Sequence, residues 1–180
     1  MAGPYPLYWA YPSCVHPTFA TEASEVFYRL VLFRVTKPPL LEDTLMRDLL
    51  YTDTRPADHI RRIDVEIYCN SNGRNHCKAV LAKVVQPVAN LTCIKHMKGL
   101  QVRLVLDCDC RMSEVNKFEE LLAPTIHMLK ANGVHVTWHK FDPYGGEPDK
   151  LKVPSRDFSC TLEELKAGIQ ANTVFNASGY

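Results

Sequence analysis

The segment from residue 101 to 141 constrains the fold most, because it carries a strand pattern, a helix pattern and a second strand pattern in succession. In its first part, apolar and polar side chains alternate, as they do in a strand with one buried face. Ser113 can cap the helix that follows, and Asn132-Gly133 can end it. Residues 134–139 then alternate again. A unit of this length predicts two parallel strands joined by a right-handed crossover.

Four earlier segments extend this unit toward the amino terminus. Residues 27–35 are dense in β-forming side chains and predict a first, well-buried strand. An apolar stripe at helical spacing from Leu41 to Leu50 predicts the first crossover helix. Residues 63–69 alternate as a second strand, and residues 77–91 carry the next helical stripe. The domain is therefore expected to be built from irregular strand–helix repeats.

The polar sides of the strands predict how the helices are arranged. A parallel sheet with helices on both faces has central strands that are apolar on both sides, whereas the strands near 62–69, 101–110 and 134–139 each keep one polar side. The sequence thus predicts an α/β domain of two layers, with a mostly parallel open sheet of about four strands and helices mainly on one face. Pro87 and Pro124 predict kinks or early ends in two of the helices.

The predicted domain organisation is one α/β domain with flanking segments. A Pro-rich and aromatic amino terminus without either periodicity predicts an extended arm, and a capping box at Thr161 and Glu164 predicts a last helix. The expected segments are an arm over 1–20, the α/β domain over 21–141, a loop over 142–158, a carboxy-terminal helix over 159–172 and a tail over 173–180.

The open face of the sheet is the predicted binding surface for a protein partner. Polar residues of equal parity on neighbouring parallel strands line up in adjacent rows of mixed charge. A solvated face without a partner is the alternative. The predicted binding residues are Arg62, Asp64, Glu66, Arg103, Asp107, Asp109, His135 and His139.

One enzymatic alternative remains open, a magnesium-dependent phosphatase-like hydrolase that uses Asp107 and Asp109. An apolar strand that ends in Asp-x-Asp resembles the nucleophile motif of haloacid-dehalogenase-type phosphatases, although Arg111 stands where that family has Thr or Ser. His135 and His139 would lie about 13 Å apart on a strand, too far apart to share a metal ion. The sequence has no P-loop, His-Glu-x-x-His or Gly-x-Ser-x-Gly motif. We therefore expect a non-enzymatic domain without a metal or cofactor.

Composition bears on compartment and partner class. The chain has 21 Lys and Arg against 20 Asp and Glu, which gives no reason to expect nucleic acid or an anionic membrane as a partner. The seven cysteines are odd in number, and Cys69, Cys108 and Cys110 fall at inward-pointing strand positions, which indicates reduced core residues. The amino terminus resembles neither a signal peptide nor a membrane helix. A cytoplasmic or nuclear location is expected.

Two motifs resemble those of a known group of proteins. Residues 21–28, TEASEVFY, are similar to the "EA-x-x-VFY" segment of ascomycete F-box-type proteins, and residues 59–65, HIRRIDV, to the "HIRRL" strand that follows it there. Residues 118–138 resemble the later helix-Gly-strand, so that the resemblance covers about 21–141. The Leu-Pro-x-Glu-Leu-Arg box that docks a ubiquitin-ligase scaffold is missing. The resemblance implies the binding half of such a protein.

Overall fold

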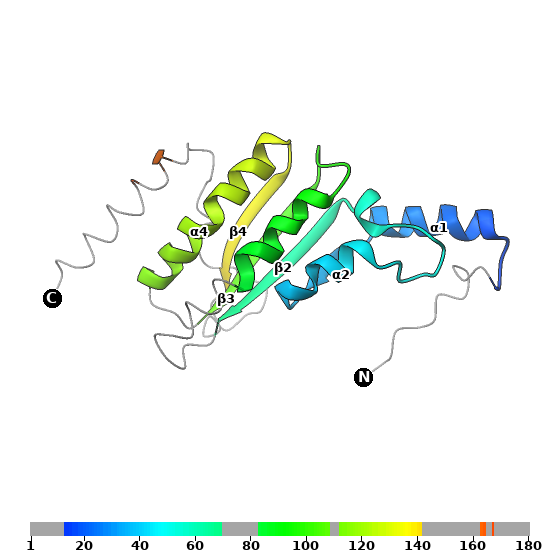
Figure 1. The fold of residues 1–180 in the computed structure, drawn as a ribbon, viewed down its shortest axis with the longest axis horizontal. Helices are drawn as coiled ribbons and strands as arrows, with labels where there is room; N and C mark the ends of the chain where they lie inside the picture. The colour runs from blue at the N-terminus through cyan, green and yellow to red at the C-terminus, as the bar shows by residue number, and fades with distance from the viewer. Residues whose placement is uncertain (1–12, 70–82, 109–111, 142–162, 165–166, 168–180) are drawn as a thin grey trace.

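The described part of the chain forms one four-stranded sheet, in which every pair of neighbouring strands is parallel (Figure 1). The computed structural model describes residues 13–69, 83–108, 112–141, 163–164 and 167 of the chain. The strands are β1 (Phe33–Val35), β2 (Arg62–Cys69), β3 (Gln101–Cys108) and β4 (His135–Phe141). The α-helices are α1 (Pro17–Leu30), α2 (Leu41–Met46), a helical segment over 83–89 and α4 (Met112–Ala131). Short 3-10 turns occupy Pro38–Leu40, Pro56–Asp58 and Asn90–Cys93.

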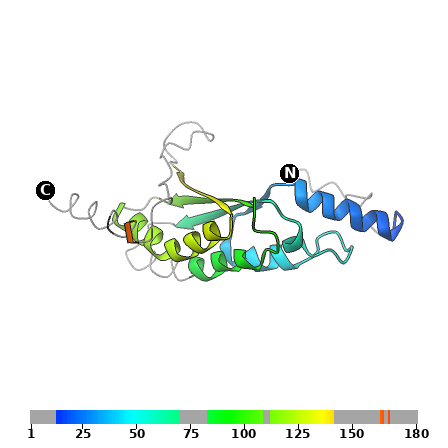
Figure 2. The same cartoon turned by 90° about the horizontal axis from the view of Figure 1, so that it is seen from above.

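The order of the strands explains the two layers. They lie side by side in chain order, β1-β2-β3-β4. Each connection therefore crosses to the next strand in the same direction, and right-handed crossovers then place all the connecting helices on one face. In Figure 2, α2, the segment over 83–89 and α4 lie together beneath the sheet, while α1 extends to one side. The predicted α/β fold is confirmed, and among the described residues the opposite face has no helix layer.

The hydrophobic core fills the space between the sheet and these helices. Every second residue of the strands is buried there, and α4 contributes a stripe of buried residues at helical spacing. Fully buried members of the core cluster are Ile63, Val65, Ile67, Leu104, Leu106, Phe118, Leu122 and Ile126.

Helix α4 ends where the Asn132-Gly133 pair predicts that it should. The amide of Gly133 donates to the Lys130 carbonyl at 2.9 Å and that of Val134 to the Leu129 carbonyl at 3.1 Å, the hydrogen-bond pattern of a Schellman cap. Gly133 has a φ of +80°, which favours glycine. Pro124 lies inside α4 without ending it, so the expected early end there is wrong. The segment over 83–89 likewise continues past Pro87 before it tightens into a 3-10 turn.

The predicted strand over 27–35 is only partly a strand, because residues 27–30 belong to a helix. Helix α1 begins at Pro17, where the His16 ring accepts a hydrogen bond from the Thr18 amide, and it continues to Leu30. Only Phe33–Val35 remain in β1, and the ring centroid of Phe33 lies 5.8 Å from that of Tyr28. Tertiary packing of the aromatic side chains thus overrides the β-propensity of the segment.

Helix α2 is also shorter than the predicted stripe over 41–50. It ends at Met46, and the Asp48 carboxylate then accepts hydrogen bonds from the Leu50, Thr52 and Thr54 amides. Because these amides donate to the Asp48 side chain, they hold the chain in a loop and do not form the backbone hydrogen bonds that would continue the helix. The same carboxylate accepts from the buried Tyr28 hydroxyl at 2.9 Å, so that it ties α1 to the loop.

The described residues test the predicted flanking segments in part. The expected arm over 1–20 is wrong for residues 17–20, because they belong to α1. Residues 1–12 and the loop over 142–158 lie outside the described residues. In the predicted helix over 159–172, residues 163, 164 and 167 are described and helical. The side chains of Cys69, Cys108 and Cys110 are not described, and their predicted burial is not tested.

Alternate residues of β3 provide a test of the two layers. Leu104 is fully buried in the core, whereas Val105 is half-buried on the open face. Leu104→Ala should lower the free energy of unfolding by about 2 to 5 kcal/mol, because it leaves a cavity. Val105→Ala should cost less than about 1 kcal/mol. Urea unfolding measures both, and similar losses at the two positions would mean that the open face is covered.

The Asp48 loop predicts a pH-dependent contribution to stability. Burial alone would raise the pKa of Asp48, but hydrogen bonds from Leu50, Tyr28, Thr52 and Thr54 hold that pKa below its ordinary value. Ionised Asp48 therefore stabilises the fold above its unfolded pKa of about 3.9, and this contribution is lost as the pH falls through the folded pKa.

Asp48→Asn should accordingly lower the free energy of unfolding at neutral pH by about 1 to 3 kcal/mol, and the difference from wild type should shrink in acid. Asp43→Asn is the matched control, because Asp43 lies in an exposed ion pair with Arg47 and should change stability by less than about 0.5 kcal/mol. Denaturant unfolding across a pH series measures both. A pH-independent difference would contradict the assignment.

Candidate functional site

The first residues of three strands form a row across the open face. Arg62 begins β2, Gln101 begins β3 and His135 begins β4, and the register pairs Arg62 with Gln101 and Gln101 with His135. Two backbone hydrogen bonds of 2.8 Å hold this register, from the Gln101 amide to the Arg61 carbonyl and from the His135 amide to the Leu100 carbonyl. The side chains of the row are exposed. The amino ends of β2, β3 and β4 are therefore level with one another.

The second row contains an ion pair at its centre. The register places Arg34, Asp64, Arg103 and Thr137 next to one another. The Nη2 atom of Arg103 donates a hydrogen bond to Oδ2 of Asp64, and the side chain of Asp64 is only 5% exposed. A carboxylate this deeply buried requires a paired charge. Arg103 therefore neutralises a charge that the sheet itself buries.

The third row lies further toward the carboxyl ends. Glu66, Val105 and His139 are in register there, and Glu66 accepts from the exposed guanidinium of Arg34. This pair and the Asp64–Arg103 pair connect β1, β2 and β3 across the face.

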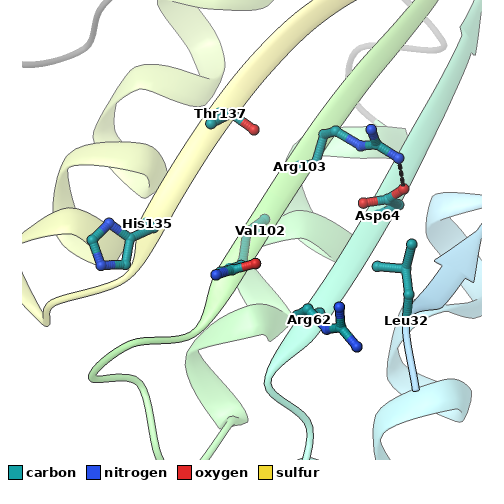
Figure 3. Close-up of a pocket in the computed structure, with 8 residues that line it drawn as sticks. Leu32, Arg62, Asp64, Val102, Arg103, His135 and Thr137 are labelled. Carbon is teal, nitrogen blue, oxygen red and sulfur yellow. Dashed lines mark hydrogen bonds and ion pairs between the residues drawn. The ribbon is translucent and has the colours of Figure 1, made fainter. Parts of the chain in front are cut away.

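A hollow of about 510 Å³ lies over the first two rows (Figure 3). In Figure 3, Arg103 reaches from β3 toward Asp64 on β2, with His135 at one side and Leu32 and Arg62 at the other. The lining residues are Leu32, Arg62, Asp64, Gln101, Val102, Arg103, His135 and Thr137. Its volume is within the range of about 300 to 1,000 Å³ that is common for binding pockets.

Arg62 connects the hollow to the end of α1. Its guanidinium donates to the carbonyl of Leu30, the last residue of the helix. A carbonyl satisfies a donor without neutralising the positive charge. Among the described residues Arg62 forms no ion pair, in contrast to Arg34, Arg47 and Arg103. The hollow thus contains one charge-neutral ion pair and one arginine whose charge is not compensated.

Two pKa shifts follow from this arrangement. The hydrogen bond that Arg103 donates to Asp64 raises the pKa of Arg103 above its ordinary value, although burial opposes this. Burial lowers the pKa of His139, the Arg103 charge lowers it further, and Asp64 acts in the opposite direction. His139 therefore loses its proton more readily than an ordinary histidine does.

The structure brings together four of the eight predicted binding residues. Arg62, Asp64, Arg103 and His135 all line the hollow, although Asp64 is buried and paired with Arg103 instead of being presented to a partner. Glu66 and His139 lie on the same face, one row away.

The two remaining predicted residues are not placed in the same way. The backbone of Asp107 is in register with Tyr68 and Phe141, but its side chain lies outside the described residues, as does Asp109 altogether. The Asp107 and Asp109 hydrolase stays an untested prediction.

The predicted set omits part of the observed site. Arg34 is exposed on the open face, whereas the sequence predicted a well-buried first strand. Arg34 stands between two apolar residues, Phe33 and Val35, and this alternation in the sequence could have identified it as pointing outward. Leu32 and the Leu30 carbonyl have no such signal, because their positions depend on where α1 ends, at Leu30.

Comparisons with protein families, with curated proteins and with solved structures find no match to this chain. The resemblance to F-box-type proteins therefore remains a prediction. Within the described ranges, no group of three or more His, Cys, Asp or Glu side chains could hold a metal ion. In that same part of the chain, no helix is both long enough and apolar enough to cross a membrane.

The lowered pKa of His139 can be measured directly. Its imidazole should titrate by NMR with a midpoint below about 6.5, the ordinary value. The unfolded chain then binds more protons than the fold as the pH falls through about 6.5, so stability should decrease there, and His139→Gln should remove that part of the decrease. Arg103→Gln should raise the midpoint, because it removes the arginine charge that lowers this pKa. A His139 midpoint at or above 6.5 in wild type would contradict this electrostatic account.

Proposed function

We propose that this chain is a non-enzymatic protein-binding domain that holds its partner on the open face of the sheet, over the hollow. The observation that carries this proposal is an all-parallel sheet with helices on one face and polar rows on the other. All-parallel sheets are found almost entirely in proteins in which both faces of the sheet are covered. A partner on the open face would supply the second cover.

The side chains on this face are of the kinds that dominate binding energy at interfaces. Arginine and tyrosine are enriched among such residues, and the face presents Arg34 and Arg62 as well as Tyr68, whose exposed fraction is 62%. A face of mixed polarity also fits an interface that forms and dissociates, because such interfaces are about as polar as the rest of the surface.

The position of the hollow supports binding over catalysis. Enzymes with open α/β sheets place their ligands at the carboxyl ends of the strands. Here the hollow lies at the amino ends, over Arg62, Gln101 and His135. The resemblance of residues 21–141 to the binding half of F-box-type proteins supports the same role.

Filling the hollow should abolish partner binding. Thr137 lines the hollow and is exposed, so Thr137→Trp should block it with little effect on stability. In quantitative affinity capture from native extract, wild type should retain a partner that the variant loses. Arg47→Glu is the control, because Arg47 follows α2 on the helix side and should leave capture unchanged.

Hydrogen exchange of the purified complex locates the contact. Protection should increase in β2, β3 and β4 and not in α2 or α4. Capture that survives Thr137→Trp, together with protection confined to the helix side, would overturn the proposal.

A further inference from the structure

The net charge of the hollow points to the kind of group that it binds. Asp64 and Arg103 cancel each other, and Arg62 adds one positive charge that no described carboxylate compensates. An arginine at the edge of a hollow can bind a carboxylate through two parallel hydrogen bonds, and such charge-assisted bonds are among the stronger polar contacts in proteins. The hollow is therefore complementary to a single negative charge.

Two uncharged polar side chains line the same hollow as Arg62. Gln101 is its neighbour in the first row, and Thr137 belongs to the second. Their amide and hydroxyl groups can donate hydrogen bonds to the oxygens of an anion that Arg62 attracts. Both also accept hydrogen bonds, which suits a peptide backbone beside the anion.

An exposed apolar ridge begins at the edge of the hollow. Leu32 lines the hollow and is 45% exposed, and Leu30, whose carbonyl binds Arg62, is 61% exposed. Val26, one helical turn before Leu30, is 49% exposed and therefore extends the ridge along α1. Apolar surface directly beside an uncompensated cation fits a ligand that carries a negative charge next to apolar side chains.

We propose that the partner docks through a peptide segment in which a carboxylate binds Arg62 and an adjacent apolar side chain packs on Leu30 and Leu32. This inference rests on the proposed function, and it names the chemistry of the partner. A phosphorylated residue carries nearly two negative charges and is typically bound by several arginines, whereas the hollow offers only one uncompensated positive charge. Charge matching thus favours a carboxylate.

The test uses a phage-displayed library of random peptides, selected on the full-length protein. Recovered peptides should share an Asp or Glu next to a large apolar residue. For one such peptide, fluorescence anisotropy should show that Arg62→Ala weakens binding by about 10- to 100-fold, the usual range for losing a charged hydrogen bond. Replacing the acidic residue of the peptide by its amide should cause a similar loss, and the two losses should not add. Arg47→Ala should leave the affinity unchanged.

A charge exchange separates recognition from misfolding. Arg62→Glu should eliminate binding of the acidic peptide, and the same peptide with Lys in place of its acidic residue should bind this variant better than it binds wild type. Circular dichroism should show that Arg62→Ala and Arg62→Glu retain the fold.

The outcomes distinguish this inference from the proposed function. If the selected peptides lack an acidic residue but are still lost with Thr137→Trp, the open face binds and the carboxylate inference is wrong. Tighter binding of a phosphorylated peptide than of its Glu counterpart would also overturn it. If no selected peptide is sensitive to Thr137→Trp or Arg62→Ala, both proposals are wrong.

Discussion

Right-handed crossovers between strands in simple sequential order determine most of this structure. When each parallel strand is placed beside the one before it and every connection turns in the same sense, no connecting helix can reach the second face. The core, the helix layer and the polar face of the described residues all follow from this constraint. The hollow at the amino ends of β2, β3 and β4 occupies the face that the chain order leaves open.

Within that face, the buried charge of Asp64 organises the electrostatics. Arg103 is committed to this carboxylate and Arg34 is paired with Glu66, whereas Arg62 forms no ion pair with the described residues and can meet a ligand. A row of charges in a sequence therefore does not show which member recognises a partner. The division of roles depends on cross-strand pairing, since similar side chains on one face can stabilise the sheet or remain available.

The sequence predicts the fold class well, because buried apolar residues recur at alternate positions of β2, β3 and β4. It fails where a segment suits two structures. Phe27 and Tyr28 favour a strand by propensity, but the hydrogen bond from Tyr28 to Asp48 belongs to a helix that packs on a distant loop. The parity of the strands also identifies the residues of the open face. Register and ion pairing cannot be inferred from parity, and these separate Arg62 from Asp64 and Arg103.

The first row of the open face is assembled only when the sheet has folded. Arg62, Gln101 and His135 lie in separate parts of the chain, and only closure of two crossovers brings them level. Parallel pairings of this kind are non-local and form slowly, because the entropy of loop closure is lost before the contacts are gained. No local hairpin or isolated helix can display this row. A ligand that requires all three strand starts would therefore distinguish the completed fold from a partly folded chain or a nascent one.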